Sequence, residues 1–237
     1  MQRSKPRFEV VMMATPEIAH YADQTRRSWE NYCEKHGYDF FLFDRKILAD
    51  MHINWSRLEM IRQRHRVSEA EWIVLVDADT FVIDDEFTLD SLVAPYGDKD
   101  VLFAPDAARR FGVWLPLDMK GFLVCRTRRP PNGGFILVRN NEFGRYFFDR
   151  WVALARGPLS HMADRHPRTQ GILWKGLYHQ HLDRIAVMYG EVVRCGTNRL
   201  LDRISLDTTE AFVLHDKRLT LPVSPAVAQR GLSQDVR

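Results

Sequence analysis

Two carboxylates separated by one residue follow an apolar run of strand length, and they are the most informative side chains of this chain. The run is Trp72 to Val76, and the carboxylates belong to Asp77 and Asp79. In an open α/β sheet such a run is buried on both faces, and its carboxyl end opens into the crevice where ligands bind. If the strand stays extended, residues i and i+2 point to the same side. Two hard oxygen donors at one point suit Mg²⁺ or Mn²⁺, which take further ligands from water and from a substrate's phosphates. The alternative is a strand that ends in a polar turn with no metal.

Length and composition bound the class of protein. A chain of 237 residues fits one α/β domain or at most two small ones. Hydrophobic residues make up 45% and charged residues 27%, which is ordinary for a globular protein. The 34 Lys and Arg residues against 31 Asp and Glu give a net charge of +3. That balance is too even to indicate a nucleic-acid partner.

Cysteine usage and the N-terminus indicate a compartment. Cys33, Cys125 and Cys195 lie far apart and form no C-x-x-C pair. This favours reduced thiols and argues against a disulfide framework or a structural zinc site. The basic N-terminus is followed only by a short apolar run, and no segment reaches the ~20 apolar residues of a membrane helix. We therefore expect a cytoplasmic protein without a transmembrane anchor.

Apolar runs and helical periods alternate along the chain. Strands are expected at 8–14, 39–43, 72–76, 101–104, 134–139, 191–195 and 211–214, and helices at 18–36, 55–68, 89–96, 141–155 and 179–189. This alternation predicts an α/β fold with a mainly parallel central sheet covered on both faces. Residues 107–131 show no period and are expected to form a long functional loop. A single domain is expected over 1–219, followed by a mobile tail at 220–237.

Several motifs occur in an order that resembles a known family. They are Lys35-His36-Gly37-Tyr38, Trp55-Ser56-Arg57, Asp77-Ala78-Asp79 and the strand that opens with Asn132-Gly133-Gly134. From about Val10 to about Leu219 the chain resembles the retaining galactosyl-, mannosyl- and xylosyltransferases of the mannan and xyloglucan type. It is similar, more distantly, to the glycogenin and lipopolysaccharide galactosyltransferase families. The resemblance implies a single Rossmann-like GT-A domain.

The resemblance also implies an activity. A metal-dependent retaining glycosyltransferase would move a hexose or pentose from a nucleotide diphosphosugar, expected to be a UDP-sugar, to a hydroxyl of a glycan or small-molecule acceptor. Asp77 and Asp79 match the metal-binding pair, and His215 matches a late histidine that completes the metal site. Because neutral imidazole suits Mn²⁺ better than Mg²⁺, manganese is the favoured cation.

Further donor contacts follow from the resemblance. Arg57 has a planar fork that would hold the diphosphate or the donor sugar, and Lys217 would neutralise the diphosphate. For both, a solvated surface charge is the alternative. The remaining donor-binding positions are Ala14 and Thr15 for uracil and ribose, Tyr21 for stacking on the base, Ala78 between the two aspartates, Asn132 for the sugar hydroxyls, and Gly133 and Gly134, which let a ligand approach the backbone. Tyr21 could instead be a core aromatic, and the Asn-Gly-Gly run a plain turn.

The chain departs from the family at the reacting centre. The family usually carries an acid followed by Gln at the start of a late helix, and this chain has His179-Gln180. Gln180 would offer its carbonyl to a developing oxocarbenium ion, whereas His179 replaces the acid. This disfavours a carboxylate nucleophile there. The remaining route is front-face substitution, in which the leaving phosphate takes the acceptor's proton.

Two other functions fit parts of the sequence. An apolar strand ending in D-x-D also opens haloacid-dehalogenase-type phosphotransferases, in which Asp77 would be the nucleophile. Those chains want Thr or Val where this one has Phe81. A catalytically silent sugar-nucleotide-binding module is the third interpretation, favoured by His179. Release of UDP, GDP or phosphate from a panel of substrates separates the three.

Overall fold

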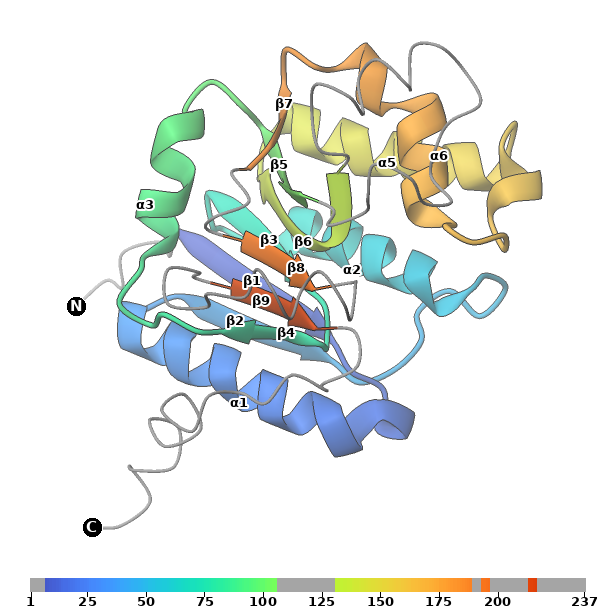
Figure 1. Cartoon of the computed structure of the whole chain (residues 1–237). Helices are drawn as coiled ribbons and strands as arrows, with labels where there is room; N and C mark the ends of the chain where they lie inside the picture. Colours follow the sequence, from blue (N-terminus) through green and yellow to red (C-terminus); the bar gives the residue numbers. More distant parts are fainter. Residues whose placement is uncertain (1–6, 106–130, 189–192, 197–212, 217–237) are drawn as a thin grey trace, which may run out of the picture.

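A six-stranded sheet forms the centre of the molecule (Figure 1). The computed structural model describes residues 7–105, 131–188, 193–196 and 213–216. The strands of the sheet follow the order β2-β1-β3-β6-β5-β7, and β6 alone runs antiparallel to its neighbours. Their bounds are β1 (Phe8–Met13), β2 (Asp39–Phe43), β3 (Trp72–Val76), β5 (Val101–Pro105), β6 (Pro131–Arg139) and β7 (Ile185–Val187).

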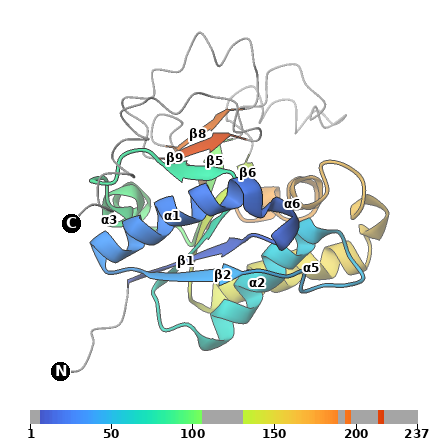
Figure 2. The same ribbon diagram turned by 90° about the horizontal axis from the view of Figure 1, so that it is seen from below.

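Helices cover both faces of this sheet (Figure 2). On one face lie α1 (Ala19–His36) and α3 (Leu89–Val93), and on the other lie α2 (Ile53–Val67), α5 (Glu142–Arg156) and α6 (Thr169–Gly176). Short 3₁₀ turns are η1 (Pro16–Ile18), η2 (Ala94–Tyr96), η3 (Ser160–Met162) and η4 (Tyr178–Gln180). Each central strand sends alternate side chains into two separate cores. In β3, Ile73 and Leu75 join the core under α2 and α5, while Val74 joins the core under α1. The continuous apolar runs of the sequence are thus explained by burial on both faces.

After β3 the chain enters a small second sheet. Its order is β4-β9-β8, with β4 (Thr80–Val82) antiparallel to β9 (Val213–Asp216), which is parallel to β8 (Val193–Gly196). The buried Trp29 of α1 donates from Nε1 to the carbonyl of Thr80 at 2.9 Å, and its ring stacks on Phe135 at 5.9 Å. This anchor fixes the start of β4, and with it the turn that links β3 to β4.

Local sequence determinants end and begin the helices as expected. Gly37 ends α1 in the left-handed region at φ 69°, a conformation that glycine adopts without steric cost. Asn141 begins α5, because its Oδ1 accepts from the Gly144 N–H at 2.9 Å.

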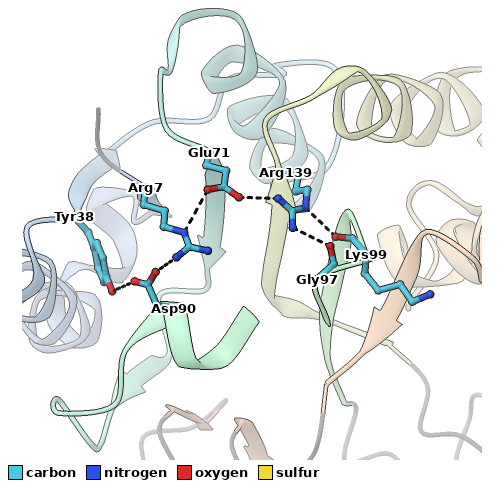
Figure 3. Close-up of polar contacts among 7 residues, drawn as sticks. All are labelled: Arg7, Tyr38, Glu71, Asp90, Gly97, Lys99 and Arg139. Carbon is cyan, nitrogen blue, oxygen red and sulfur yellow. Dashed lines mark hydrogen bonds and ion pairs between the residues drawn. The ribbon is translucent and has the colours of Figure 1, made fainter. Parts of the chain in front are cut away.

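A polar network joins strand and helix ends at one edge of the sheet (Figure 3). Glu71 binds both Arg7 and Arg139 at 3.3 and 2.7 Å, and Arg7 also pairs with Asp90. The Tyr38 hydroxyl donates to Asp90 at 3.1 Å. Arg139 also donates to the carbonyls of Gly97 and Lys99. The network lies at the amino ends of β1 and β3. The loops that follow these strands therefore meet at the opposite end of the sheet, where the carboxyl ends of β1 and β3 lie.

The strands and helices predicted from the sequence up to residue 156 are confirmed, with shifts of a few residues. The largest of these shifts is at the start of β6, predicted at Gly134, because the strand already begins at Pro131 and includes both glycines. The helix predicted at 179–189 is wrong. Its residues form the turn η4 and the strand β7, and the helix in this part of the chain is α6, which ends at Gly176. Of the loop predicted at 107–131, residues 107–130 lie outside the described residues and Pro131 belongs to β6; the tail predicted at 220–237 also lies outside them. No helix among the described residues has the length and apolarity needed to cross a membrane.

Candidate functional site

The two aspartates lie in a turn at the carboxyl end of β3. The Thr80 N–H and hydroxyl donate to the Asp77 carbonyl at 3.0 and 2.6 Å, which closes the turn over Asp77-Ala78-Asp79. The strand therefore does not stay extended through this motif, which was the condition under which residues i and i+2 would point to the same side. Asp77 and Asp79 are partly exposed, whereas Ala78 is buried. The turn presents the two carboxylates, and Ala78 anchors it.

The pKa of Tyr21 responds to both carboxylates. Burial first, and then the charges of Asp79 and Asp77, raise the pKa of the Tyr21 hydroxyl. The phenol is thus within electrostatic range of both carboxylates. Tyr21 comes from the first turns of α1, and its ring packs edge-on against His20 at 5.0 Å. The side chain is half-buried, so it is not a core aromatic. Stacking on a base stays a prediction.

Arg57 connects the aspartate turn to the start of β6. From α2, its Nη2 atom pairs with Asp77 Oδ1 and also donates to the Gly133 carbonyl. The side chains of Arg57 and Asp77 are 17% and 20% exposed, so the ion pair is largely shielded from water. The solvated surface charge that was the alternative for Arg57 is thus wrong. At the predicted site Arg57 thus links the carboxyl end of β3 to the amino end of β6.

The Asn132-Gly133-Gly134 run lies beside this turn. The Asp77 N–H donates to the Gly134 carbonyl at 2.8 Å, which continues the pairing of β3 with β6. Asn132 is 2% exposed, and its Oδ1 accepts from the Gly134 N–H at 2.6 Å. The side-chain carbonyl of Asn132 is therefore used within its own strand. The amide N–H₂ is the end of the side chain that could donate to a sugar hydroxyl.

Ala14 and Thr15 follow β1, the strand next to β3. Ala14 donates its N–H to the Phe43 carbonyl at 2.9 Å, and Thr15 begins the turn η1. A hydrogen bond from the Thr15 side chain lowers the pKa of Glu17. Because β1 and β3 are parallel neighbours, Ala14 and Thr15 lie at the same end of the sheet as the aspartate turn, where the strands have their carboxyl ends.

The backbone of His215 comes near the aspartate turn from far along the chain. In the antiparallel pairing of β4 with β9, His215 is the partner of Thr80, the residue that follows Asp79. Lys217 lies outside the described residues. Among the described side chains, no group of three or more His, Cys, Asp or Glu is gathered for a metal. Two carboxylates fit a hard divalent cation that completes its shell with water and phosphate.

His179 and Gln180 have contacts of another kind. Both are exposed and belong to η4. The centre of the His179 ring lies 4.6 Å from that of Trp174 and 5.4 Å from that of Tyr178, both edge-on. The Gln180 backbone N–H donates to the Leu177 carbonyl at 3.0 Å. No α-helix starts at this pair, so the helix predicted to begin at His179 is wrong, and the roles of His179 and Gln180 stay a prediction.

A different glutamine lies where a helix does start. α6 begins with Thr169-Gln170, and Gln170 Nε2 donates to the Pro131 carbonyl at 3.1 Å. The Gln170 Cγ atom would be 3.6 Å from a Cβ built on Gly133. Gln170 therefore touches the strand entrance to which Arg57 binds. Gln170 was not predicted from the sequence, because Thr169 stands where an acid was expected and because the apolar run 171–174 lacks an amphipathic period.

Known proteins resemble the chain in sequence. A model of the galactosyl transferase GMA12/MNN10 family matches residues 9–102. An alpha-1,2-galactosyltransferase of Schizosaccharomyces pombe is 22% identical over 181 residues, which are 65% of this chain and 48% of the relative. An uncharacterized alpha-1,2-galactosyltransferase of the same yeast is 24% identical over 165 residues, 58% of this chain and 44% of the relative. The chain thus spans about half the length of the curated relatives it matches.

Solved structures resemble the chain over nearly its whole length. A glycosyltransferase involved in glycosylation of the major capsid of PBCV-1 superimposes with a TM-score of 0.68 at 16% identity, covering 95% of this chain and 97% of that one. The galactosyltransferase LgtC, in complex with donor and acceptor sugar analogs, gives a TM-score of 0.55 at 12% identity, with 97% of both chains covered. The GT-A fold and the resemblance to the galactosyltransferase family, both predicted from the motifs, are confirmed.

Proposed function

We propose that this GT-A chain is a retaining glycosyltransferase that transfers galactose from UDP-galactose to a hydroxyl group of a glycan or small-molecule acceptor. One observation carries the proposal: Arg57 ties the aspartate turn after β3 to the entrance of β6, within a fold that glycosyltransferases use. The galactosyltransferase names of the relatives support the choice of sugar. A cytoplasmic location remains a prediction from the sequence.

Asp77 and Asp79 would hold a divalent cation, Mn²⁺ or Mg²⁺, with His215 as the third protein ligand. The carboxylates come from one turn, and β9 brings the His215 backbone opposite Thr80. When bound, the cation would neutralise the charge that develops on the leaving diphosphate. Tyr21 would then border the nucleotide, because the two carboxylates lie near its hydroxyl.

Arg57 would turn from Asp77 to the donor when the cation is bound. A guanidinium that already binds a carboxylate and a carbonyl has the donors to hold a phosphate or a sugar hydroxyl. Asn132 would offer its amide N–H₂ to the sugar, and Gly133 and Gly134 keep the strand entrance free of side chains. Ala14 and Thr15 would border the uracil and ribose, with Lys217 as a further diphosphate contact.

The reacting centre is proposed at Gln170. Its side chain packs against Gly133 at the strand entrance, whereas Gln180 and His179 belong to a later turn. A neutral amide can offer its carbonyl dipole to a developing positive charge at the anomeric carbon. No carboxylate nucleophile is assigned, so the leaving phosphate would take the acceptor's proton on the front face and the product would keep the α configuration.

Release of UDP from UDP-galactose in the presence of Mn²⁺ tests the proposal. The wild-type chain should release UDP, and the panel of other donors should include UDP-glucose, UDP-xylose and GDP-mannose. Gln170→Ala should lower kcat by about two to three orders of magnitude, as removal of one preorganised dipole does. Gln180→Ala is the matched control and should change kcat little.

Each result that departs from this expectation favours a different alternative. A strong loss with Gln180→Ala and a mild one with Gln170→Ala would return the reacting centre to η4. Binding of UDP without any turnover across donors would favour the silent sugar-nucleotide module. Phosphate release from simple phosphate esters would favour the phosphotransferase with an Asp77 nucleophile.

A further inference from the structure

The outer edge of β2 carries apolar side chains that are open to solvent. β2 is the last strand of the main sheet on its side, and β1 is its strand neighbour (Figure 2). Phe41 and Leu42 are 39% and 38% exposed, and Val67 at the end of α2 is 66% exposed. Natural sheets usually shield such an edge with charge, proline or a bulge. The sequence Asp39–Phe43 contains no proline, and its pairing with β1 shows no bulge.

A groove of about 460 Å³ runs between this edge and α2. Its wall on the α2 side includes Gln63, Arg64 and Val67. Arg64 is fixed by the buried Glu9 through two hydrogen bonds of 2.7 and 2.8 Å, and its guanidinium lies 3.6 Å from the centre of the Phe41 ring. The edge is therefore a preformed surface rather than a set of loose side chains.

The pairing with β1 determines which backbone groups face outward. The Phe43 carbonyl accepts from the Ala14 N–H, so Phe43 directs its backbone groups toward β1. Because this direction alternates along a strand, Asp39 and Phe41 do the same, while Phe40 and Leu42 direct their N–H and C=O groups away from the sheet. A second strand could therefore hydrogen-bond to Phe40 and Leu42.

We propose that the occupant of this edge is β2 of a second copy of the chain, paired antiparallel across a two-fold axis through Leu42. In this register Leu42 faces Leu42 of the second copy and the two exchange hydrogen bonds. Phe41 faces Phe43, and Asp39 faces Arg45. Each two-fold contact occurs twice, so the register forms two aromatic pairs and two pairs of opposite charge. The strand must extend by two residues, to Arg45, when it pairs.

The charges select this register over its neighbour. In the Leu42 register Asp44 faces Phe40, and a two-fold axis through Phe41 would likewise place each Asp39 opposite Phe43, but only the Leu42 register also pairs Asp39 with Arg45. The Leu42 register joins two six-stranded sheets into one continuous sheet. The strands of the two copies run in opposite directions, and the two aspartate turns therefore point away from each other. Self-association requires no assumption about the activity.

Charge exchange between Asp39 and Arg45 tests both the interface and the register. Sedimentation equilibrium of the full 237-residue chain, from about 1 to about 100 µM, should show dimers. Asp39→Arg and Arg45→Asp should each weaken self-association by at least about tenfold, because like charges then face each other twice. An equimolar mixture of the two variants should restore dimers, since every cross-strand pair is again of opposite charge.

Controls separate this result from misfolding. Arg150→Asp makes the same charge change as Arg45→Asp at an exposed position of α5 and should leave the dimer intact. Unchanged circular dichroism and urea midpoints would show that the Asp39 and Arg45 variants fold. A wild-type chain that stays monomeric at all concentrations would overturn the proposal. So would single variants that dimerise as the wild type does, or a mixture that stays monomeric.

Discussion

Arg57→Met should have opposite effects on the binding of metal and of nucleotide. Methionine keeps much of the apolar stem of the side chain but removes the guanidinium that binds Asp77 Oδ1 and the Gly133 carbonyl. Without metal, Asp77 loses its cationic partner in a site where the two side chains are only 20% and 17% exposed. Hydrogen bonds to charged groups contribute about 1.5–3 kcal/mol, so the free energy of unfolding should fall by about 2 kcal/mol.

The same energy should appear with the opposite sign when Mn²⁺ binds. In the wild-type chain the cation must displace Arg57 from Asp77, and in the variant it does not compete with this guanidinium. A difference of about 2 kcal/mol corresponds to about 30-fold tighter binding of Mn²⁺ alone. Affinity for UDP in the presence of Mn²⁺ should fall, because the guanidinium is also a proposed contact of the diphosphate or sugar.

Calorimetric titration with Mn²⁺ and urea unfolding with EDTA measure the two effects. Arg62→Met is the matched control, since Arg62 lies on the same helix but pairs with Glu59 and Asp149. It should leave Mn²⁺ affinity unchanged. If Arg57→Met binds Mn²⁺ no more tightly than the wild type, the ion pair with Asp77 does not compete with the metal and the reasoning is refuted.

Two further predictions concern stability. Gly144→Ala should destabilise the chain by about 1–3 kcal/mol despite its better helix propensity, because the new Cβ would overlap the Arg139 carbonyl and lie 2.8 Å from Val138 Cγ2. Gly97→Ala meets nothing within 4 Å and should stay within about 0.5 kcal/mol of the wild type in urea unfolding, so equal midpoints for the two variants would contradict the packing. Burial lowers the pKa of His65, so the unfolded chain takes up this proton first, and stability should decline as pH falls below about 6.5. His65→Asn should flatten the change in urea midpoint between about pH 7.5 and about pH 5.5, and an unchanged slope would show that His65 does not contribute.

Local rules explain why most of the fold could be predicted. The buried run before Asp77 needs only the two-sided burial of a central strand, and Gly37 and Asn141 mark helix ends through their own backbone and side-chain chemistry. The start of β6 was predicted three residues too late because a proline and two glycines suggest a turn. There the strand is held by pairing with β3 and β5, which are distant in sequence.

The candidate site depends on contacts that span long distances along the chain. The sequence identified Asp77 and Arg57 as separate motifs, but their ion pair requires α2 to pack against the end of β3. Gln170 was missed because its contact with Pro131 crosses 39 residues and its helix is buried, without an amphipathic period. Burial on all sides removes the periodic pattern from which helices are recognised.

The most direct test of the central claim is a calorimetric titration of UDP into the chain, with Mn²⁺ and again with EDTA. The aspartate turn is proposed to bind the nucleotide through a divalent cation, so UDP should bind in Mn²⁺ and lose most of its affinity in EDTA. Asp79→Ala should lose the Mn²⁺-dependent part of binding while its urea midpoint stays close to that of the wild type. Equal UDP affinity with and without the cation, or in Asp79→Ala and the wild type, would contradict the metal-dependent donor site.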